Sequence, residues 1–243
     1  MRRLERWVRV GGAPVIGILG AMTAEIQQIG ELLDDPNTSE AGGREYLTGT
    51  VDDQQAVVAI SGFGKVAAAS TVTTMLDLFE PDSIVFTGVA GGLHSKVARG
   101  DVVVAEALVQ HDFDASPIVP RFVIPSLQID RIPTDPILTD RAAASAAMLS
   151  GATVHRGLVL SGDHFIDSAA DRARLRSLFD DALAVEMEGA AVAQVCAERK
   201  VPFAVIRVIS DTADEAAASD FLEFVADQAA PILATIVAGM VSR

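Results

Sequence analysis

The sequence is poor in cysteine, in cationic side chains and in long apolar runs. A single cysteine among 243 residues excludes an internal disulfide framework. Lys and Arg total 19 against 33 Asp and Glu, and a chain with a net charge of −14 repels the phosphates of nucleic acids. No apolar run reaches the roughly 20 residues of a membrane-spanning helix. We therefore expect a cytoplasmic protein that binds neither nucleic acid nor a membrane.

Histidines are also few, and their positions give no metal site. The four of them, His94, His111, His155 and His164, lack the spacing of metal ligands. The stretch HDFD at 111–114 has residue types that bind metals, but acidic residues in a proline-rich loop are usually solvated. We predict that the protein uses no metal and no cofactor.

The residues that are abundant predict one large core. Half of the chain is hydrophobic (50%) and the mean hydropathy is +0.34. The basic start, MRRLERWVRVGGAPV, contains no apolar run long enough for a signal peptide. We predict an N-terminal extension over residues 1–13 and a single domain over residues 14–243. Cys196 lies in an apolar helical stretch and is predicted to pack in the core.

Apolar strands alternate with helical stretches along the chain. Strands are expected at 15–20, 83–88, 100–110, 154–162, 183–188 and 202–210, with a hairpin over 46–60 that turns at Asp52 and Asp53. Helices are expected at 24–33, 65–79, 136–149, 168–179, 189–200 and 221–241, the last bent at Pro231. Residues 111–136 are proline-rich and irregular. This alternation predicts an α/β fold with a mixed, mostly parallel twisted sheet flanked by helices.

Two glutamates flank a methionine in VEMEGAA, residues 185–191, where a short strand runs into a helix. A buried charge is costly unless another group pairs with it. Acidic residues are also favoured at a helix start by the helix dipole. By itself the motif therefore fits either a helix start or a site that binds hydroxyls or a developing cation.

The residues that directly follow the strands are further candidates for a binding site, because ligands in α/β folds bind at the carboxyl ends of strands. These stretches are GAMTAE (20–25), SGFGK (61–65), VAGGL (89–93), SGDHFI (161–166), EMEG (186–189) and SD (210–211). GFGK and GILGAM lack the spacing of phosphate-binding and dinucleotide-binding motifs, and GFGK predicts a tight strand-to-helix turn. GVAGG would let backbone N–H groups approach a flat or anionic ligand. We expect these glycines and carboxylates to converge on one rim.

Seven stretches, taken together and in this order, resemble the signature blocks of a known enzyme family. They are IGILGAMTAEI, SGFGKVAAA, TGVAGGL, GDVVV, SGDHFI, VEMEGAAVAQVC and VPFAVIRVISDTAD. They resemble the 5′-methylthioadenosine/S-adenosylhomocysteine nucleosidases of the purine nucleoside phosphorylase-like superfamily, from Val15 to the C-terminus except at 111–136. The resemblance implies a nucleoside phosphorylase-like fold, a homodimer, and cofactor-free hydrolysis of the N-glycosidic bond of 5′-substituted adenine nucleosides, which releases adenine.

The resemblance also implies roles for the acidic residues. Asp211 would protonate adenine at N7 and Glu25 would activate water, because this reaction needs an acid for the leaving base and a base for the nucleophile. Arg207 would help to hold Glu25 and the water. Glu188 would accept hydrogen bonds from the ribose hydroxyls, and Glu186 would lie near the 2′-hydroxyl. Two carboxylates would thus face a transition state that resembles an oxocarbenium ion.

The remaining residues implied by the resemblance surround the substrate. Phe165 would stack on adenine, and the backbone of Ile166 would read the edge of the base. Met187 would pack against the sugar, and Ser210 would orient Asp211. The rest of the predicted site consists of Met22, Val89, Ala90 and Gly91.

Val89 departs from the family, which usually carries serine or threonine at this position. The missing hydroxyl would cost about 1 kcal/mol if it normally bonds to the water and Glu25. A neighbouring group then compensates, or the substrate differs, or the rate is lower. The 5′ substituent is open as well; in the family its pocket borrows residues from a second subunit. Here segment 111–136 would lend them, with Phe113, Ile118, Phe122 and Ile124 as candidates.

Two alternative functions stay open. A purine nucleoside phosphorylase would need arginines around the glycine loop, where this chain has FTGVAGG. A nucleoside-binding module without turnover would be expected to lack Glu25 or Asp211, and this chain has both.

Overall fold

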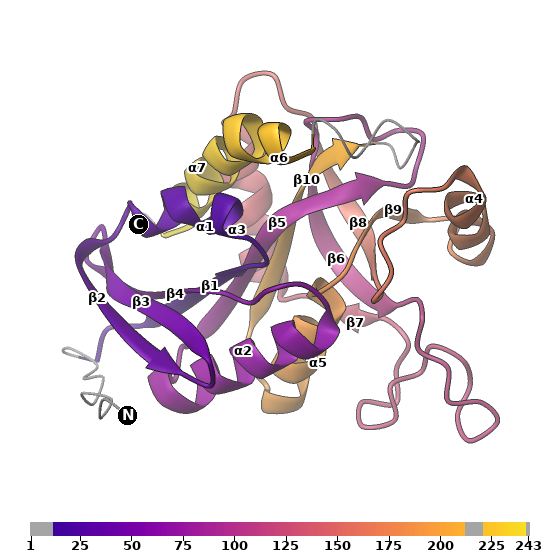
Figure 1. Ribbon diagram of the computed structural model, residues 1–243, viewed down its shortest axis with the longest axis horizontal. Coiled ribbons are helices and arrows are strands. Elements are labelled where there is room, and N and C mark those ends of the chain that lie inside the picture. The colour runs from indigo at the N-terminus through magenta and orange to yellow at the C-terminus, as the bar shows by residue number, and fades with distance from the viewer. Residues whose placement is uncertain (1–11, 212–220, 242–243) are drawn as a thin grey trace.

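One mixed β-sheet organises the protein in a computed structural model, which describes residues 12–211 and 221–241 (Figure 1). The strands are β1 Val15–Gly20, β2 Asp34–Ala41, β3 Arg44–Val51, β4 Gln54–Ile60, β5 Ser83–Gly92, β6 Val102–Gln110, β7 Ile132–Pro133, β8 Val154–Ser161, β9 Ala182–Glu186 and β10 Phe203–Asp211. The helices are α1 Thr23–Gly30, α2 Lys65–Phe79, α3 Pro136–Ala147, α4 Ala169–Leu178, α5 Gly189–Arg199, α6 Phe221–Phe224, the π-helical turn η1 Val225–Ala229 and α7 Ala230–Val241.

Part of the sheet closes on itself. The strand order is β10-β6-β8-β9-β5-β1-β4-β3-β2, and β10 also pairs with β5. Strands β5, β10, β6, β8 and β9 therefore form a closed ring, from which β1, β4, β3 and β2 continue as an open sheet. Parallel and antiparallel pairings between named strands are equal in number, five of each. The predicted mixed α/β sheet is confirmed, but parallel pairing does not predominate, because the β2–β3–β4 meander and the ring closure add antiparallel pairs.

Helices cover both faces of the sheet, as the sequence predicts. Helices α2 and α5 pack against each other on one face, and α1, α3 and α7 pack together on the other (Figure 1). The strands between them are buried on both sides, which explains their continuous apolar runs. Cys196 is a fully buried residue of α5 within the hydrophobic core, so its predicted place in the core is confirmed. Burial raises the pKa of its thiol to about 12.

The structure departs from the expected elements at several places, among them the two-residue strand β7 within the segment expected to be irregular. Strand β2 was not expected, since its side chains are mostly exposed and show no apolar alternation. Strand β5 extends through the expected glycine loop to Gly92, because Val89 and Ala90 pair with β10 and the last two glycines pair with β9. The closing helix widens into η1, which ends two residues before Pro231, whose backbone nitrogen has no hydrogen to donate to a helical hydrogen bond.

The predicted hairpin is confirmed. Asp52 and Asp53 form its two-residue turn with φ values of 48° and 64°, the backbone that matches the twist of the flanking strands. The predicted N-terminal extension lies almost entirely outside the described residues. No helix in the described part of the chain combines the length and apolarity that a bilayer crossing requires.

Candidate active site

The residues that follow six strands surround one cavity of about 370 Å³. This volume suits a small organic ligand. The lining residues come from the ends of β1, β4, β5, β8, β9 and β10 and are Ala21, Met22, Glu25, Phe63, Val89, Ala90, Gly91, His164, Phe165, Ile166, Val185, Glu186, Met187, Glu188, Ser210 and Asp211. Every site residue predicted from the sequence is among them except Arg207, which is buried next to Glu186.

Four lining residues were not predicted: Ala21, Phe63, His164 and Val185. Phe63 was open to prediction, because it lies in SGFGK directly after a strand. A larger groove of about 900 Å³ lies between α1 and strands β3 and β4. Its lining contains none of the predicted acidic site residues, whereas Glu25, Glu186, Glu188 and Asp211 all line the smaller cavity. The smaller cavity is therefore the candidate active site.

Glu25 is held at the start of α1 by backbone amides. Its Oε2 accepts hydrogen bonds from the amides of Ala21 and Met22, each at 2.9 Å, and its Oε1 accepts one from Val89 at 2.9 Å. Burial raises the pKa of this carboxyl, although the charge of Arg207 and the three amides act in the opposite direction. A buried carboxylate with a raised pKa is a better base than an exposed one.

The close approach of Glu25 to β5 depends on a glycine. A Cβ at Gly88 would lie 2.6 Å from Glu25 Oε1, which is too short for any real contact. The glycine at this point of TGVAGG therefore makes room for the carboxylate, and its neighbour Val89 supplies the amide that binds it.

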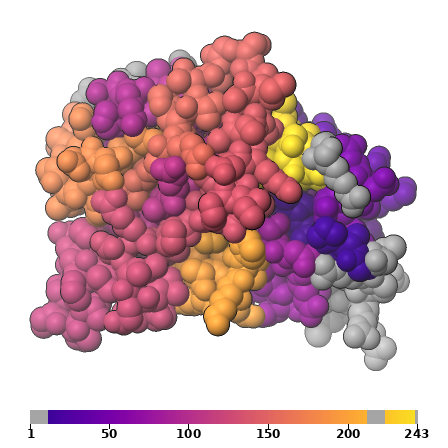
Figure 2. All heavy atoms as spheres, turned by 180° about the vertical axis from the view of Figure 1, so that it is seen from behind, coloured from indigo at the N-terminus to yellow at the C-terminus, as the bar shows by residue number. Residues whose placement is uncertain are grey.

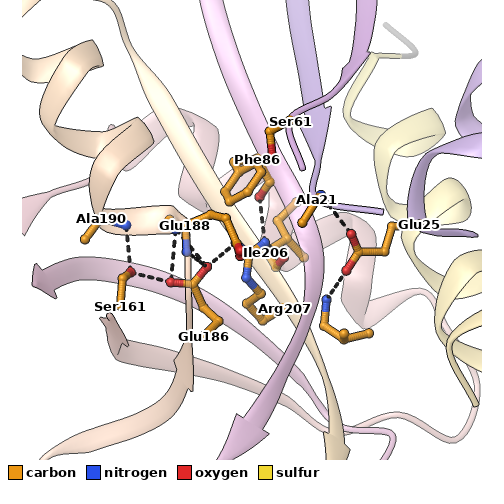
Figure 3. A network of polar contacts seen from close by, with 12 residues as sticks. Ala21, Glu25, Ser61, Phe86, Ser161, Glu186, Glu188, Ala190, Ile206 and Arg207 are labelled. Atoms are coloured by element: carbon orange, nitrogen blue, oxygen red, sulfur yellow. Dashed lines mark hydrogen bonds and ion pairs between the residues drawn. The ribbon is translucent and has the colours of Figure 1, made fainter. Parts of the chain in front are cut away.

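Glu186 is the centre of a buried hydrogen-bond network (Figure 3). It accepts hydrogen bonds from Arg207 Nη2 at 2.6 Å, from the amides of Glu188 and Gly189, and from the hydroxyl of Ser161. Ser161 in turn accepts from the amide of Ala190 at 2.7 Å. The first glutamate of VEMEG therefore fixes the start of α5, as the helix-start interpretation of the motif predicts.

Arg207 differs from its predicted placement. Its ion pair is with Glu186, not Glu25, and its guanidinium lies 4.3 Å from the centre of the Phe86 ring. A second nitrogen donates to the carbonyl of Ile206 at 3.1 Å. Arg207 acts on Glu25 through its charge alone, and Figure 3 shows it between the two glutamates. The sequence spacing could not reveal this partner, because β10 and β9 come together only in the folded ring.

Glu188, the second glutamate of the motif, lines the cavity with one oxygen bound to the amide of Gly64 at 2.8 Å. Burial and the nearby charge of Glu186 raise the pKa of Glu188 to about 8. The carboxyl group therefore keeps its proton in the folded protein at pH values where it is ionised in the unfolded chain.

This difference predicts a pH-dependent stability. A carboxyl group with a pKa near 8 when folded and 4.5 when unfolded stabilises the fold fully below pH 4.5, and this stabilisation is lost as the pH rises through 8. Glu188→Gln, which stays neutral, should match wild type in melting temperature at pH 4.5. It should exceed wild type by several degrees at pH 8.5, since about 1 kcal/mol shifts the melting temperature of a domain of this size by about 2–4 °C.

The measurement is thermal unfolding across this pH range, with the exposed Glu45→Gln as the matched control. A difference between Glu188→Gln and wild type that is constant with pH would contradict the raised pKa.

Asp211 lies at the cavity end of β10 with Ser210 beside it. The Ser210 hydroxyl lies 2.7 Å from Asp211 Oδ2 and 3.3 Å from the carbonyl oxygen of Ala90. Ser210 is buried, whereas Asp211 is partly exposed to the cavity. The expected contact between these two neighbours is therefore present.

Comparisons with known proteins identify the class. A sequence model of the phosphorylase superfamily matches residues 15–242, so the chain belongs to that superfamily. The 5′-methylthioadenosine/S-adenosylhomocysteine nucleosidase of Neisseria meningitidis in complex with methylthio-immucillin-A is 36% identical, with a TM-score of 0.89 over 93% of this chain and 98% of that one. The corresponding nucleosidase of Colwellia psychrerythraea, in complex with adenine, is 34% identical, with a TM-score of 0.89 over 94% and 95%.

A futalosine hydrolase of Helicobacter pylori is equally similar, at 38% identity and a TM-score of 0.87 over 94% of this chain and 97% of that one. With these matches, the chain is a member of the 5′-methylthioadenosine/S-adenosylhomocysteine nucleosidase family.

Proposed function

We propose that this protein hydrolyses the N-glycosidic bond of 5′-substituted adenine nucleosides and releases adenine. The observation that carries the proposal is the placement of Glu25, Glu188 and Asp211 on one cavity. An acid, a base and a group that can bind ribose hydroxyls are the parts that this reaction needs. We also infer from the composition of the chain that the protein works in the cytoplasm, and from the family resemblance that it serves methionine salvage.

In the proposed mechanism Asp211 donates a proton to N7 of adenine while the bond between ribose C1′ and the base breaks. The bonding electrons leave with adenine, and positive charge develops on the ribose ring. Glu25 takes a proton from a water molecule, whose oxygen then bonds to C1′. The amides of Ala21, Met22 and Val89 hold the Glu25 carboxylate in one orientation for this step.

The other lining residues bind the substrate in this proposal. Glu188 accepts hydrogen bonds from the ribose hydroxyls, and Met187 packs against the sugar. Phe165 stacks on adenine next to the backbone of Ile166, with Phe63 as a second aromatic wall. Glu186 accepts a hydrogen bond from the amide of Glu188 and pairs with the charge of Arg207. We therefore assign Glu186 the role of positioning Glu188.

Water is favoured over phosphate as the nucleophile. Among the described residues that line the cavity there is no lysine and no arginine, and Arg207 is already paired with Glu186. A phosphate dianion would also be repelled by the carboxylate of Glu25. The test is adenine release from a panel of 5′-methylthio, homocysteinyl, 5′-deoxy and futalosine-type nucleosides, with and without phosphate. Turnover that requires phosphate would establish a phosphorylase, and binding of adenine without any turnover would establish a binding module.

We further propose a homodimer in which a second copy covers the cavity. Phe63 and Phe165 line the cavity and are 66% and 46% exposed, and the neighbouring Val66 is 81% exposed, which leaves apolar surface at its mouth. Segment 111–136 protrudes from the body of the protein (Figures 1 and 2). Of the four candidates to reach a partner, Ile118 is 88% exposed.

The other three candidates in this segment serve the chain's own core. Ile124 is buried in the hydrophobic core, and Phe113 packs against the core cluster to which Ile124 belongs. The ring centres of Phe122 and Phe179 lie 4.9 Å apart. We therefore assign contact with a partner to Ile118 alone. Analytical ultracentrifugation of wild type and Ile118→Asp tests this, because a charge at a dimer contact should shift the protein towards the monomer.

Val89→Thr should not increase the hydrolysis of methylthioadenosine. The Glu25 carboxylate already takes a hydrogen bond from the amide of Val89, and the partly buried valine side chain packs against the core cluster that includes residues of α1. A hydroxyl placed in this apolar contact costs free energy. We expect kcat/KM to stay within about threefold of wild type or to fall, with Val89→Ala as the control for lost volume. A several-fold rise, as about 1 kcal/mol would allow, would show that the missing hydroxyl is a simple deficit.

A further inference from the structure

The HDFD motif that follows β6 connects two loops of the cavity. Asp112 Oδ1 accepts a hydrogen bond from Lys65 Nζ at 2.6 Å, and Asp112 Oδ2 accepts one from the amide of Asp163 at 2.9 Å. Asp163 Oδ1 accepts from the amide of Lys65 at 2.8 Å. These three contacts close a ring that joins the start of α2, the end of β6 and the loop after β8. We call Lys65, Asp112 and Asp163 the loop clamp.

The loop clamp is charged and shielded from water on one side. The side chains of Lys65 and Asp112 are 17% and 31% exposed. Partial burial acts to raise the pKa of Asp112, but the hydrogen bonds from Lys65 and Asp163 outweigh it and hold the pKa below its usual range. Lys65 also donates to the buried Gln110 at 3.2 Å. Charge-assisted hydrogen bonds of this kind are stronger than bonds between neutral groups.

Both loops that the clamp joins carry residues of the cavity. Phe63 and Gly64 directly precede Lys65, and the amide of Gly64 binds Glu188 Oε1. Phe165 and Ile166 follow Asp163 by two and three positions. The clamp therefore joins the two loops that carry the phenylalanines bordering the cavity.

Glycines allow these loops to come close. Gly64 has a φ of +88°, and a Cβ there would lie 3.0 Å from Asp163 Oδ1. Gly162 faces the ring of the buried His111, where a Cβ would lie 2.3 Å from Nε2. The amide of His111 also donates to the carbonyl of Ser161 at 3.0 Å. Each half of the HD pair therefore contacts the SGDHFI loop, the ring of His111 at Gly162 and the carboxylate of Asp112 at Asp163.

We propose that Lys65 and Asp112 are positioning residues for base binding, which hold Phe63 and Phe165 at the spacing that an aromatic base requires. This inference rests on the proposed function, and it assigns the HDFD motif a role in place of a metal site. Since neither side chain lines the cavity, the clamp should affect how tightly the base binds and leave the chemical step nearly unchanged.

The experiment compares Asp112→Asn, Lys65→Met, the double variant and Lys65→Arg with wild type. Asn keeps the size of Asp112 and one oxygen for the Asp163 amide, so the fold is preserved. The control is Asp77→Asn on the same helix as Lys65, α2, which breaks an exposed ion pair of 2.8 Å to Arg199 at the end of α5. The measurements are kcat and KM for methylthioadenosine, the Kd of adenine by calorimetry, and the melting temperature.

Asp112→Asn and Lys65→Met should each raise KM and the adenine Kd by about tenfold, with kcat within about threefold of wild type. The double variant should be no worse than either single variant, because both changes open the same ring. Lys65→Arg keeps the positive charge and should therefore retain most of the wild-type affinity for adenine. Asp77→Asn should have no effect on KM.

Three results would overturn the inference: an unchanged KM in both single variants, a loss of kcat at constant KM, or effects of the two changes that simply add. If Lys65→Met fails to fold, Asp112→Asn and Lys65→Arg still decide. If wild type binds adenine but releases none from any nucleoside, the proposed function fails, while the adenine Kd values still test the clamp.

Discussion

Asp211→Asn is expected to lower adenine release by at least about 10²-fold without unfolding the protein. The amide has nearly the same shape as the carboxyl group but cannot donate a proton to the leaving base. Ser210 can still donate its hydroxyl to the amide oxygen, so the end of β10 should keep its conformation. The measurement is kcat for methylthioadenosine together with the melting temperature.

Ser210→Ala is the matched control for this position. It removes the hydroxyl that orients Asp211 and leaves the acid in place, so a much smaller loss of rate is expected. If kcat of Asp211→Asn stays within a few-fold of wild type, Asp211 is not the acid of this reaction.

Glu25→Gln should remove turnover to a similar extent while substrate still binds. The two Glu25 oxygens accept hydrogen bonds from three backbone amides. Glutamine has one oxygen and one NH₂ group in place of these two oxygens. One side of the carboxamide must then face an N–H donor, so a moderate fall in melting temperature should accompany the loss of the base. Single-turnover kinetics and equilibrium binding of methylthioadenosine separate the two effects.

The control for Glu25→Gln is Glu31→Gln at the other end of α1, where the side chain is exposed. It should leave both rate and binding unchanged. If Glu25→Gln instead abolishes binding and leaves the rate of bound substrate intact, Glu25 is a binding residue and the mechanism needs another base.

Local sequence patterns were enough to predict most of the framework. The buried strands carry continuous apolar runs and the helices between them carry helical spacing, so β1, α2 and the β3–β4 hairpin could be placed nearly to the residue. The end of β5 could not, because its glycines are ordered by pairing with β9 and β10 and not by their own preferences. Strand β2 was missed because an exposed edge strand needs no apolar face.

The site shows the same division between local and tertiary information. Rules about strand ends and the family resemblance located Glu25, Glu188 and Asp211 on one cavity. The ion pair between Arg207 and Glu186 joins residues 21 positions apart, and the contact between Lys65 and Asp112 joins residues 47 positions apart. Such pairs depend on which strands become neighbours, and a single sequence does not contain that information directly.

The two ends of the sheet have different consequences for how copies of this protein can associate. At one end the β5–β10 pairing satisfies the backbone, and at the other the outer edge of β2 pairs with no strand among residues 12–211 and 221–241. That edge carries Asp34, Asp35, Pro36 and Glu40, and a proline and acidic side chains oppose the addition of another strand. We therefore expect copies to meet through side-chain surfaces, and the edge residues of β2 disfavour growth into strand-paired fibrils.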